Sequence, residues 1–290
     1  NSPIDQLIGF FNATQDAKIS LERLGEVHLR DDEEDAEGSR IADIPENVGI
    51  EIQNLEFRYE GPDSEAVLND ISIHIPAGKQ TAIVGTSGSG KTTLVKLLLG
   101  FYPPNKGEIR LGSNLLDAYS LRSWREECGV VMQEGFIFSD TIARNIAPGV
   151  EVIDKERLLN AARVANISDF INTLPLSYNT KIGGEGHGLS QGQKQRILIA
   201  RAVYKNPQFI FFDEATNALD ANNERTILEN LQEFFKGRTA VVVAHRLSTV
   251  KNADQIIVLE KGKVVETGTH KELSEKKGAY YTLVKNQLEL

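Results

Sequence analysis

The residues from Gly85 to Thr92 read GTSGSGKT, which matches the spacing G-x-x-x-x-G-K-[ST] of a phosphate-binding loop. Glycines let such a loop curl until its N–H groups point at phosphate oxygens, and the positive end of the following helix adds to the attraction. The pattern predicts that Lys91 reaches the β- and γ-phosphates of a nucleotide and that the Thr92 hydroxyl holds Mg²⁺. The alternative is a Gly/Ser-rich turn that contains a lysine by chance. A strand before the loop and a helix after it favour the phosphate site.

A second group with chemical potential is the acidic pair Asp213-Glu214, which follows the apolar run Phe209–Phe212. A buried strand delivers such residues to the carboxyl edge of its sheet, where ligands bind. Because side chains alternate along a regular strand, the two carboxylates cannot both point the same way while the strand stays regular. One can hold the metal while the other faces the attacking water as a general base. A plain acidic turn is the alternative, and the apolar run and the upstream lysine loop disfavour it.

The segments that must position these residues alternate between strands and helices, which indicates an α/β fold with a parallel sheet. The expected strands are 50–59, 67–75, 81–84, 209–212, 240–244 and 256–259, and the expected helices are 92–99, 156–165, 191–204 and 223–235. The strand at 50–59 alternates partly, as an edge or half-buried strand does. The strands at 209–212, 240–244 and 256–259 are fully apolar, so we expect them to be buried on both faces.

The composition limits the classes of protein to consider. Hydrophobic residues make up 40% and charged residues 25% of the 290 residues, which is ordinary for a globular protein. The formal net charge of −9 argues against a nucleic-acid partner, because phosphate backbones require a basic face. Cys128 is the single cysteine, so neither an internal disulfide nor a cluster of thiolate ligands is available. No apolar run approaches the ~20 residues of a membrane helix.

The amino-terminal part differs from the rest. Ile4, Leu7, Ile8 and Phe11 form one helical stripe, and the first 28 residues are predicted to be helical. An acidic run at 31–37 follows, typical of a solvated linker. We therefore expect a helix over 1–30, a linker over 31–47 and one large domain over 48–290. Because the chain begins with asparagine, we also expect it to be a fragment or a processed product.

A further motif selects among the many proteins that contain phosphate-binding loops. The run Leu189-Ser190-Gln191-Gly192-Gln193 resembles the LSGGQ signature of the ABC transporter ATPases, with Gln191 in place of the usual glycine. Ser190 lies at the N-cap of the helix predicted to follow, so exposed N–H groups and the helix dipole can face a γ-phosphate. The resemblance implies that this phosphate belongs to a second copy of the domain. A homodimer would then sandwich two ATP molecules head to tail.

Four more residues match the family pattern. Tyr59 corresponds to the aromatic residue that stacks on adenine, although a tyrosine on an edge strand is the alternative. Gln133 resembles the glutamine that contacts Mg²⁺ or the water. Asp220 matches the loop that crosses the dimer interface, where Asn217 replaces the commoner serine. His245 resembles the histidine that hydrogen-bonds the γ-phosphate, and a structural histidine is its alternative. The matching motifs together cover residues 50–270.

The resemblance implies a P-loop NTPase with a RecA-like, mostly parallel core, an antiparallel β subdomain and an α-helical signature subdomain. Its catalytic residues are expected to be Lys91, Gln133, Glu214 and His245. Its metal ligands are expected to be Thr92, Gln133 and Asp213. Its nucleotide-binding residues are expected to be Tyr59, Gly85, Thr86, Ser87, Gly88, Ser89, Gly90, Lys91, Thr92, Thr93, Ser190, Gly192, Gln193 and Asp220.

The cofactors implied are ATP and Mg²⁺. The run Asn105-Lys106-Gly107-Glu108 is similar to the guanine-reading pattern N-K-x-D, but its last residue does not match. It also follows two prolines, so a turn explains it better and ATP is favoured over GTP.

Other segments indicate the branch of the family. The run at 136–146 resembles the exporter pattern, and the loop at 183–188 occupies the place where exporters contact their membrane domain. The stripe at 16–24 resembles the end of a last membrane helix. These features predict an ATPase joined to a transmembrane domain of the same exporter, on the cytoplasmic side of the cytoplasmic membrane. Peptide and bacteriocin exporters with an amino-terminal peptidase are the most similar. A non-transport ATPase acting on DNA or the ribosome, and an importer subunit, are the alternatives.

Overall fold

The computed structural model describes residues 2–29, 33, 40–61, 64–184, 186–215, 219, 221–244 and 246–288. The chain forms two compact units, residues 1–39 and residues 40–290. In the first unit, helix α1 (Ser2–His28) agrees with the predicted amino-terminal helix. Ile4, Leu7, Ile8 and Phe11 on its predicted stripe are all more than half exposed. Within the described ranges, no helix combines the length and the apolar character needed to cross a membrane.

The second unit begins at Arg40, whereas the sequence places a domain start at residue 48. Ile41 forms a bridge with Tyr119, and Ile44 is buried. The carbonyl of Pro45 accepts a hydrogen bond of 3.1 Å from Gln208 Nε2. These contacts bind the segment ahead of residue 48 to the domain. Most of the acidic run at 31–37 lies outside the described residues.

The second unit is built on a six-stranded sheet with the order β12-β11-β3-β10-β9-β6. Its strands are β3 (Gln80–Gly85), β6 (Cys128–Val131), β9 (Phe209–Asp213), β10 (Thr239–Val243), β11 (Gln255–Glu260) and β12 (Lys263–Gly268). All neighbouring pairs are parallel except β11 with β12, which is antiparallel. All five residues of β9 and all five of β10 are buried, as their apolar sequences predict.

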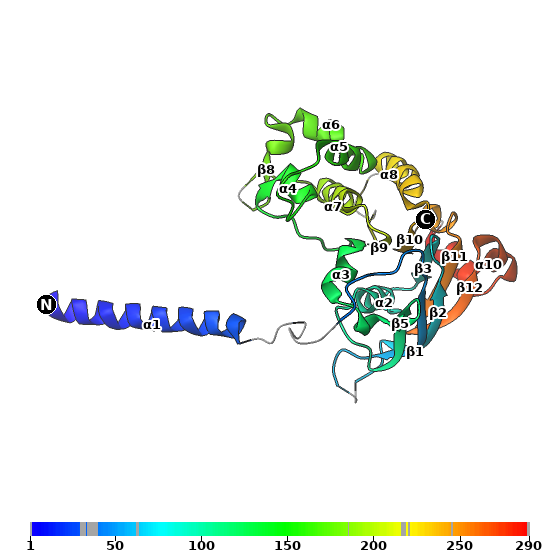
Figure 1. Ribbon diagram of the computed structural model, residues 1–290, viewed down its shortest axis with the longest axis horizontal. Helices are drawn as coiled ribbons and strands as arrows, with labels where there is room; N and C mark the ends of the chain where they lie inside the picture. The colour runs from blue at the N-terminus through cyan, green and yellow to red at the C-terminus, as the bar shows by residue number, and fades with distance from the viewer. Residues whose placement is uncertain are drawn as a thin grey trace. The chain divides into compact units, whose positions relative to one another are not determined.

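An antiparallel sheet with the order β2-β1-β4-β5 accompanies the parallel one. Its strands are β1 (Ile50–Phe57), β2 (Leu68–Ile75), β4 (Lys106–Leu111) and β5 (Asn114–Leu115). Strand β1 lies between β2 and β4, so it is a half-buried interior strand and not an edge strand. Figure 1 shows the labelled strands β1, β2 and β5 at the opposite side of this unit from the helices between α4 (Ile142–Ile146) and α7 (Gln191–Lys205).

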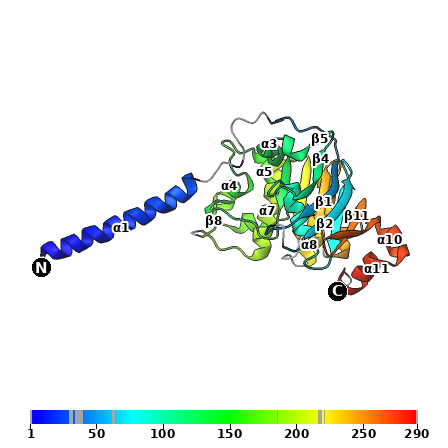
Figure 2. The ribbon, with the colours of Figure 1, turned by 90° about the horizontal axis from the view of Figure 1, so that it is seen from below.

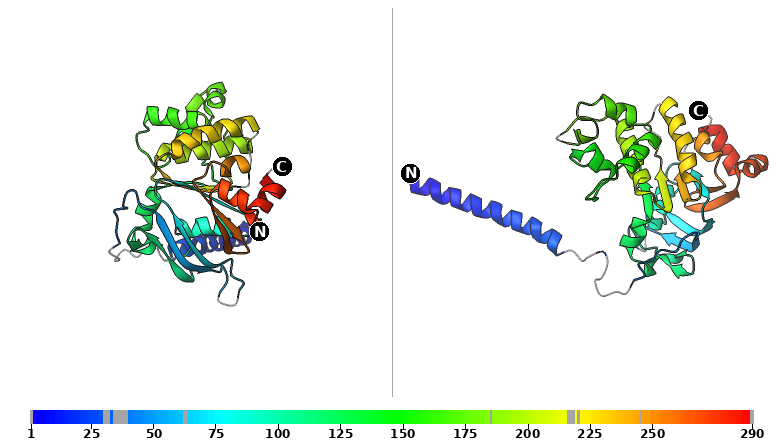
Figure 3. Two further views of the ribbon diagram at one scale, coloured as in Figure 1. Left: turned by 90° about the vertical axis from the view of Figure 1, so that its right-hand side faces the viewer. Right: turned by 45° about the horizontal axis from the view of Figure 1, so that its top comes forward.

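Helices pack on both faces of the parallel sheet (Figure 3), with α2 (Lys91–Leu98) on one face and α7 (Gln191–Lys205) and α8 (Ala221–Phe235) on the other. The α-helices of this unit are α2 (Lys91–Leu98), α3 (Leu121–Glu126), α4 (Ile142–Ile146), α5 (Lys155–Val164), α6 (Ser168–Thr173), α7 (Gln191–Lys205), α8 (Ala221–Phe235), α9 (Leu247–Val250), α10 (His270–Lys276) and α11 (Ala279–Leu283). The short elements are η1 (Leu116–Ala118), η2 (Ser177–Asn179), η3 (Val284–Leu288), β7 (Asp140–Thr141) and β8 (Lys181–Ile182). The carboxyl-terminal helices α10 and α11 lie beside β11 and β12 (Figure 2).

The alternation of side chains along β9 assigns its residues to two of the apolar cores. Phe209 and Phe211 belong to a core that they share with α2 and the antiparallel sheet. Ile210 and Phe212 belong to a second core, which they share with helices α4, α5, α7 and α8. Successive residues of β9 face opposite sides of the sheet. The strand therefore packs against the helices on one side and against α2 and the antiparallel sheet on the other.

Trp124 on α3 is the largest fully buried side chain of the first of these cores. Its Nε1 donates a 2.9 Å hydrogen bond to the carbonyl of Leu98 at the end of α2. Its ring lies 4.8 Å from the Phe209 ring and 6.3 Å from the Phe211 ring, centroid to centroid. A single residue thus links α3, α2 and β9.

We expect Trp124→Ala to lower the free energy of unfolding by about 4 kcal/mol, because it leaves a large cavity. Trp124→Phe keeps most of the apolar volume but leaves the Leu98 carbonyl unpaired, so about 1–2 kcal/mol is expected. Arg122→Ala on the same helix removes only an exposed pair with Glu126 and is the control, with less than about 0.5 kcal/mol expected. Urea denaturation followed by circular dichroism measures all three. Equal losses for Trp124→Ala and Arg122→Ala would contradict this account.

Candidate active site

The glycine loop runs from the end of β3 into the first turn of α2, as its sequence predicts. A Cβ atom on Gly85 would lie 2.1 Å from the carbonyl oxygen of Leu259 and 2.7 Å from the hydroxyl of Ser89. Gly90 has φ +99°, and a Cβ there would lie 2.6 Å from the Leu68 side chain. Both positions therefore require glycine. Gly85 is needed because its backbone lies so close to β11, and Gly90 is needed for its left-handed backbone and for its close approach to Leu68.

The Lys91 side chain binds the start of its own loop. Its side chain is buried, and its Nζ donates hydrogen bonds to the carbonyl oxygens of Gly85 (3.0 Å) and Thr86 (2.9 Å). Burial lowers the pKa of Lys91 below its ordinary value, and the nearby carboxylates of Glu214 and Asp213 act in the opposite direction. The ammonium group is therefore held in place by carbonyl oxygens of its own loop.

A cavity of about 230 Å³ opens beside this loop. It brings together residues from β3–α2, from the segment after β6 and from the end of β9. Among the predicted site residues, those that line it are Ser87, Gly88, Gly90, Lys91, Thr92, Thr93, Gln133 and Glu214. Residues separated by more than a hundred positions in the chain thus meet in one hollow. The parallel strands explain this convergence, because their carboxyl ends finish at the same edge of the sheet.

The acidic pair sits where β9 ends. Asp213 is the last residue of the strand and is fully buried, whereas Glu214 is half-buried and lines the cavity. Glu214 has φ +51°, a left-handed backbone that non-glycine residues rarely adopt. The strand therefore stops being regular between the two carboxylates. The alternation that restricts a regular strand does not apply beyond Asp213.

Tyr59 lies just beyond β1, and its side chain is 48% exposed. Its hydroxyl lies 3.1 Å from the hydroxyl of Thr93 in the first turn of α2, within hydrogen-bond distance. Its ring meets those of Phe57 and Tyr102 edge-on, with centroid separations of 4.9 Å and 5.4 Å. The structure thus brings this predicted adenine-stacking residue to the helix that begins with Lys91, with its side chain half-exposed.

The signature residues form a capped helix start, as predicted. The Ser190 hydroxyl accepts a hydrogen bond of 3.2 Å from the backbone N–H of Gln193. The Gln193 side chain accepts one of 2.8 Å from the N–H of Ser190, which completes a capping box. Among the described residues that line the cavity beside Lys91, none comes from the run 189–193. The start of α7 therefore presents its N–H groups elsewhere than to the glycine loop of its own chain.

Some predicted residues cannot be placed. Asp220 and His245 lie outside the described residues, as do Asn217 and Glu185. Their neighbours are described: Ala244 follows β10 and is buried, and α8 begins at Ala221. The roles expected of Asp220 and His245 stay predictions.

The structure also adds a residue that the sequence did not single out. Val67 lines the cavity next to the glycine loop, and its N–H donates a 2.9 Å hydrogen bond to the carbonyl of Phe57. Its carbonyl oxygen would lie 3.0 Å from a Cβ on Gly90. A valine ahead of a strand carries no sequence signal for such a place, because only the pairing of β1 with β2 brings it there.

The residues present suit Mg²⁺ bound together with nucleotide phosphates. A threonine hydroxyl, a glutamine amide and an aspartate carboxylate supply the oxygen ligands that this ion prefers. Thr92 and Gln133 line the cavity, and Asp213 is buried at the adjacent strand end. Within the described part of the chain, no group of three or more His, Cys, Asp or Glu side chains is arranged to hold a metal. Mg²⁺ characteristically keeps phosphate and water ligands beside one or two protein carboxylates.

The chain is similar to known proteins of one family. The family model described as ABC transporter matches residues 68–217, about half of the chain. The leukotoxin translocation ATP-binding protein LktB of Mannheimia glucosida is 42% identical over 290 residues, which is 100% of this chain and 40% of that protein. The protein of the same name from Bibersteinia trehalosi is also 42% identical over 290 residues, with the same 100% and 40% coverage. The chain spans about two fifths of the length of these curated relatives.

A solved structure described as a bacterial Atm1-family ABC exporter with ATP bound shares the fold. It is 35% identical with a TM-score of 0.84, and the match covers 93% of this chain and 47% of that one. The predicted fold, a P-loop core with an antiparallel β subdomain and a helical subdomain, is thereby confirmed.

We expect Lys91→Met to weaken ATP binding about 100-fold, because it removes charge-assisted hydrogen bonds to phosphate. The rise in melting temperature expected of the unmodified chain with Mg²⁺ and ATP should require about 100-fold more ATP in this variant. Lys96→Met, at a partly exposed position of the same helix, is the matched control and should keep the full shift. Differential scanning fluorimetry with increasing ATP measures both. An undiminished shift in Lys91→Met would show that the loop lysine does not bind the phosphates.

Proposed function

This chain belongs to the ABC transporter family, and on that premise we propose that it is the ATP-binding and ATP-hydrolysing domain of an exporter. One observation carries the proposal: Lys91, Thr92, Gln133 and Glu214 meet in a single cavity at the carboxyl edge of a parallel sheet. The reaction is ATP plus water to ADP plus phosphate. We assign the phosphates, Mg²⁺ and the general base Glu214 to this cavity.

The residues divide the work of hydrolysis. The N–H groups of the loop and the Lys91 ammonium bind and orient the phosphates, and Tyr59 stacks on adenine. Thr92, Asp213 and Gln133 hold Mg²⁺, which when bound neutralises charge on the phosphate oxygens. Glu214 accepts a proton from the water that attacks the γ-phosphate. His245 donates a hydrogen bond to the same phosphate group.

Completion of the site requires a second copy of the chain. The capped start of α7 is exposed at Ser190 and does not line the cavity of its own protomer. A head-to-tail homodimer would place Ser190, Gly192 and Gln193 of each protomer against the ATP bound by the other, with Asp220 crossing between them. The N–H groups and positive dipole of a 15-residue helix suit a γ-phosphate. ATP then closes the dimer, and hydrolysis reopens it.

The exporter assignment is supported by the names of the relatives and by features of the surface. The matched relatives are named leukotoxin translocation proteins, and the matched structure is an exporter with ATP bound. Phe136 and Phe138, in the segment after Gln133, are 70% and 45% exposed and would contact a membrane domain. The exposed apolar stripe of α1 would continue from a membrane helix of the same polypeptide. We infer a site of action on the cytoplasmic side of the membrane and a peptide or protein cargo.

The assignment of the base predicts the behaviour of Glu214→Gln. The amide cannot accept the proton, so hydrolysis should fall by about 100-fold or more while ATP binding persists. With hydrolysis blocked, ATP-bound dimer should accumulate in size-exclusion chromatography. Glu229→Gln, the same change at an exposed position of α8, is the control and should hydrolyse ATP normally. A Glu214→Gln variant with near-normal turnover would exclude Glu214 as the base.

The shared site predicts complementation between two inactive variants. Lys91→Met removes the phosphate contact of one protomer, and Ser190→Arg blocks the signature of the other. A mixed dimer contains one site assembled from intact halves and one from both damaged halves. Mixing the two variants should therefore restore part of the ATPase rate, measured as phosphate release, that neither shows alone. A mixture as inactive as its components would count against the sandwich.

A further inference from the structure

The pairing of β1 with β4 continues past the last residue of β1 by means of a side chain. Glu56 pairs with Lys106 in the antiparallel ladder, and the N–H of Asn105 donates a 2.9 Å hydrogen bond to the Glu56 carbonyl. One step further, the N–H of Arg58 donates to Asn105 Oδ1 at 2.6 Å. The Asn105 side chain thus takes the place of the next backbone carbonyl. It fixes the backbone of the residue directly before Tyr59.

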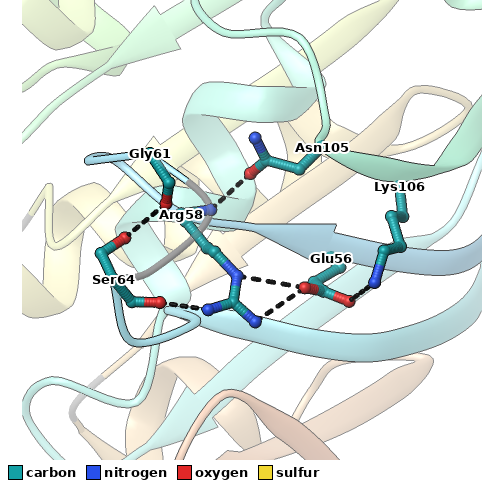
Figure 4. A network of polar contacts seen from close by, with 6 residues as sticks. All are labelled: Glu56, Arg58, Gly61, Ser64, Asn105 and Lys106. Carbon is teal, nitrogen blue, oxygen red and sulfur yellow. Dashed lines mark hydrogen bonds and ion pairs between the residues drawn. The ribbon is translucent and has the colours of Figure 1, made fainter.

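Charged groups reinforce this extension (Figure 4). The Glu56 carboxylate accepts hydrogen bonds from Arg58 Nε and Nη2, at 3.1 Å and 2.9 Å, and from Lys106 Nζ at 3.0 Å. Hydrogen bonds from Lys106 and Arg58 hold the pKa of Glu56 below its ordinary value. The third nitrogen of the guanidinium, Nη1, donates to the carbonyl of Ser64. Arg58 therefore spans the turn after β1 and binds both of its ends.

The aromatic side chains lie on the opposite face of the same segment. Within β1, Phe57 faces away from Glu56 because side chains alternate along a strand. Tyr59 meets the Phe57 ring, whereas Arg58 pairs with Glu56. Phe57 is buried and meets the Tyr59 ring edge-on, while Tyr102 meets both rings. Tyr102 precedes Asn105 by one short turn. The polar network on one face therefore fixes the two segments whose aromatic rings meet on the other.

We propose that Arg58 and Asn105 are positioning residues for the nucleotide base: they hold Tyr59, with Tyr102 at its edge, as a preformed platform for adenine. The inference rests on the proposed binding of ATP and on the role proposed there for Tyr59. Neither Arg58 nor Asn105 lines the cavity that takes the phosphates. The effect of these two residues is therefore confined to the part of the ATP affinity that the adenine base contributes.

The physical reason is preorganisation. Tyr59 is half-exposed, and its ring meets those of Phe57 and Tyr102 edge-on. A loop that must order its backbone and a tyrosine rotamer on binding loses affinity through conformational entropy. The network removes that loss in advance, because the backbone on the amino-terminal side of Tyr59 is already fixed by Asn105 and Arg58.

The experiment compares two ligands by isothermal titration calorimetry on the full chain: ATP with Mg²⁺, and inorganic tripolyphosphate with Mg²⁺, which has no base. Tyr59→Ala should weaken ATP binding about 10-fold through lost stacking and leave tripolyphosphate binding unchanged. Arg58→Gln and Asn105→Ala should each weaken ATP binding about 3- to 5-fold, again with no change for tripolyphosphate. In the Tyr59→Ala background, neither change should have a further effect.

A matched control is present in the same sheet. Arg110 and Glu108 on β4 form a comparable pair, with Nε and Oε1 2.7 Å apart. Arg110→Gln removes a similar ion pair away from Tyr59 and should leave both affinities unchanged.

The possible outcomes distinguish a failure of the positioning role of Arg58 and Asn105 from a failure of the adenine-stacking role of Tyr59. If Tyr59→Ala weakens ATP but the Arg58 and Asn105 variants do not, the positioning inference fails and the proposed site stands. If those variants weaken both ligands, or still weaken ATP without Tyr59, their role is general stability and the inference again fails. If Tyr59→Ala changes neither affinity, the adenine-stacking role itself is wrong, and the inference falls with it. Loss confined to ATP and to the intact Tyr59 background supports the inference.

Discussion

The parallel register of β3, β10 and β9 is the constraint on which the site depends. Gly85 ends one strand and Asp213 another, and β10 lies between them with Val243 opposite Asp213. Strand β6 continues the same direction on the other side of β9, so the segment that carries Gln133 leaves from the same edge. If any of these strands ran the other way, its functional residue would lie at the opposite edge of the sheet. Burial of β9 and β10 on both faces fixes this register, because a shift by one residue would exchange the two cores.

The position of Lys91 shows how the chain holds a charged group out of water. Two loop carbonyls and two nearby carboxylates offset part of the cost of burial. The loop proposed to bind phosphate is thus also the loop that holds the lysine. An ammonium group that its own loop holds in position is preorganised for the phosphates proposed to bind there.

Local signals in the sequence were sufficient for much of the site. The glycine spacing predicted the loop, the apolar run predicted the strand before the acidic pair, and Ser190 was correctly placed at a helix N-cap. The contacts that the sequence did not reveal all join distant segments. Val67 beside the loop and Tyr59 against Thr93 depend on how β1 and β2 pair and lie next to α2, and no local pattern encodes that. The edge position considered for the strand at 50–59 was wrong because alternation reports burial of one face, not the presence of a second neighbour. The left-handed backbone at Glu214 was equally invisible, since glutamate carries no preference for it.

The left-handed backbone at Glu214 limits which residues at this position can make the domain more stable. A non-glycine residue held at positive φ carries conformational strain of about 1 kcal/mol or more. Glycine or asparagine at position 214 would relieve the strain and make the fold more stable, yet neither has a carboxylate. With Glu214 as the proposed base, thermal stability and turnover oppose each other at this one position. Selection or design for stability alone would favour a domain that folds well but lacks the carboxylate proposed to activate water.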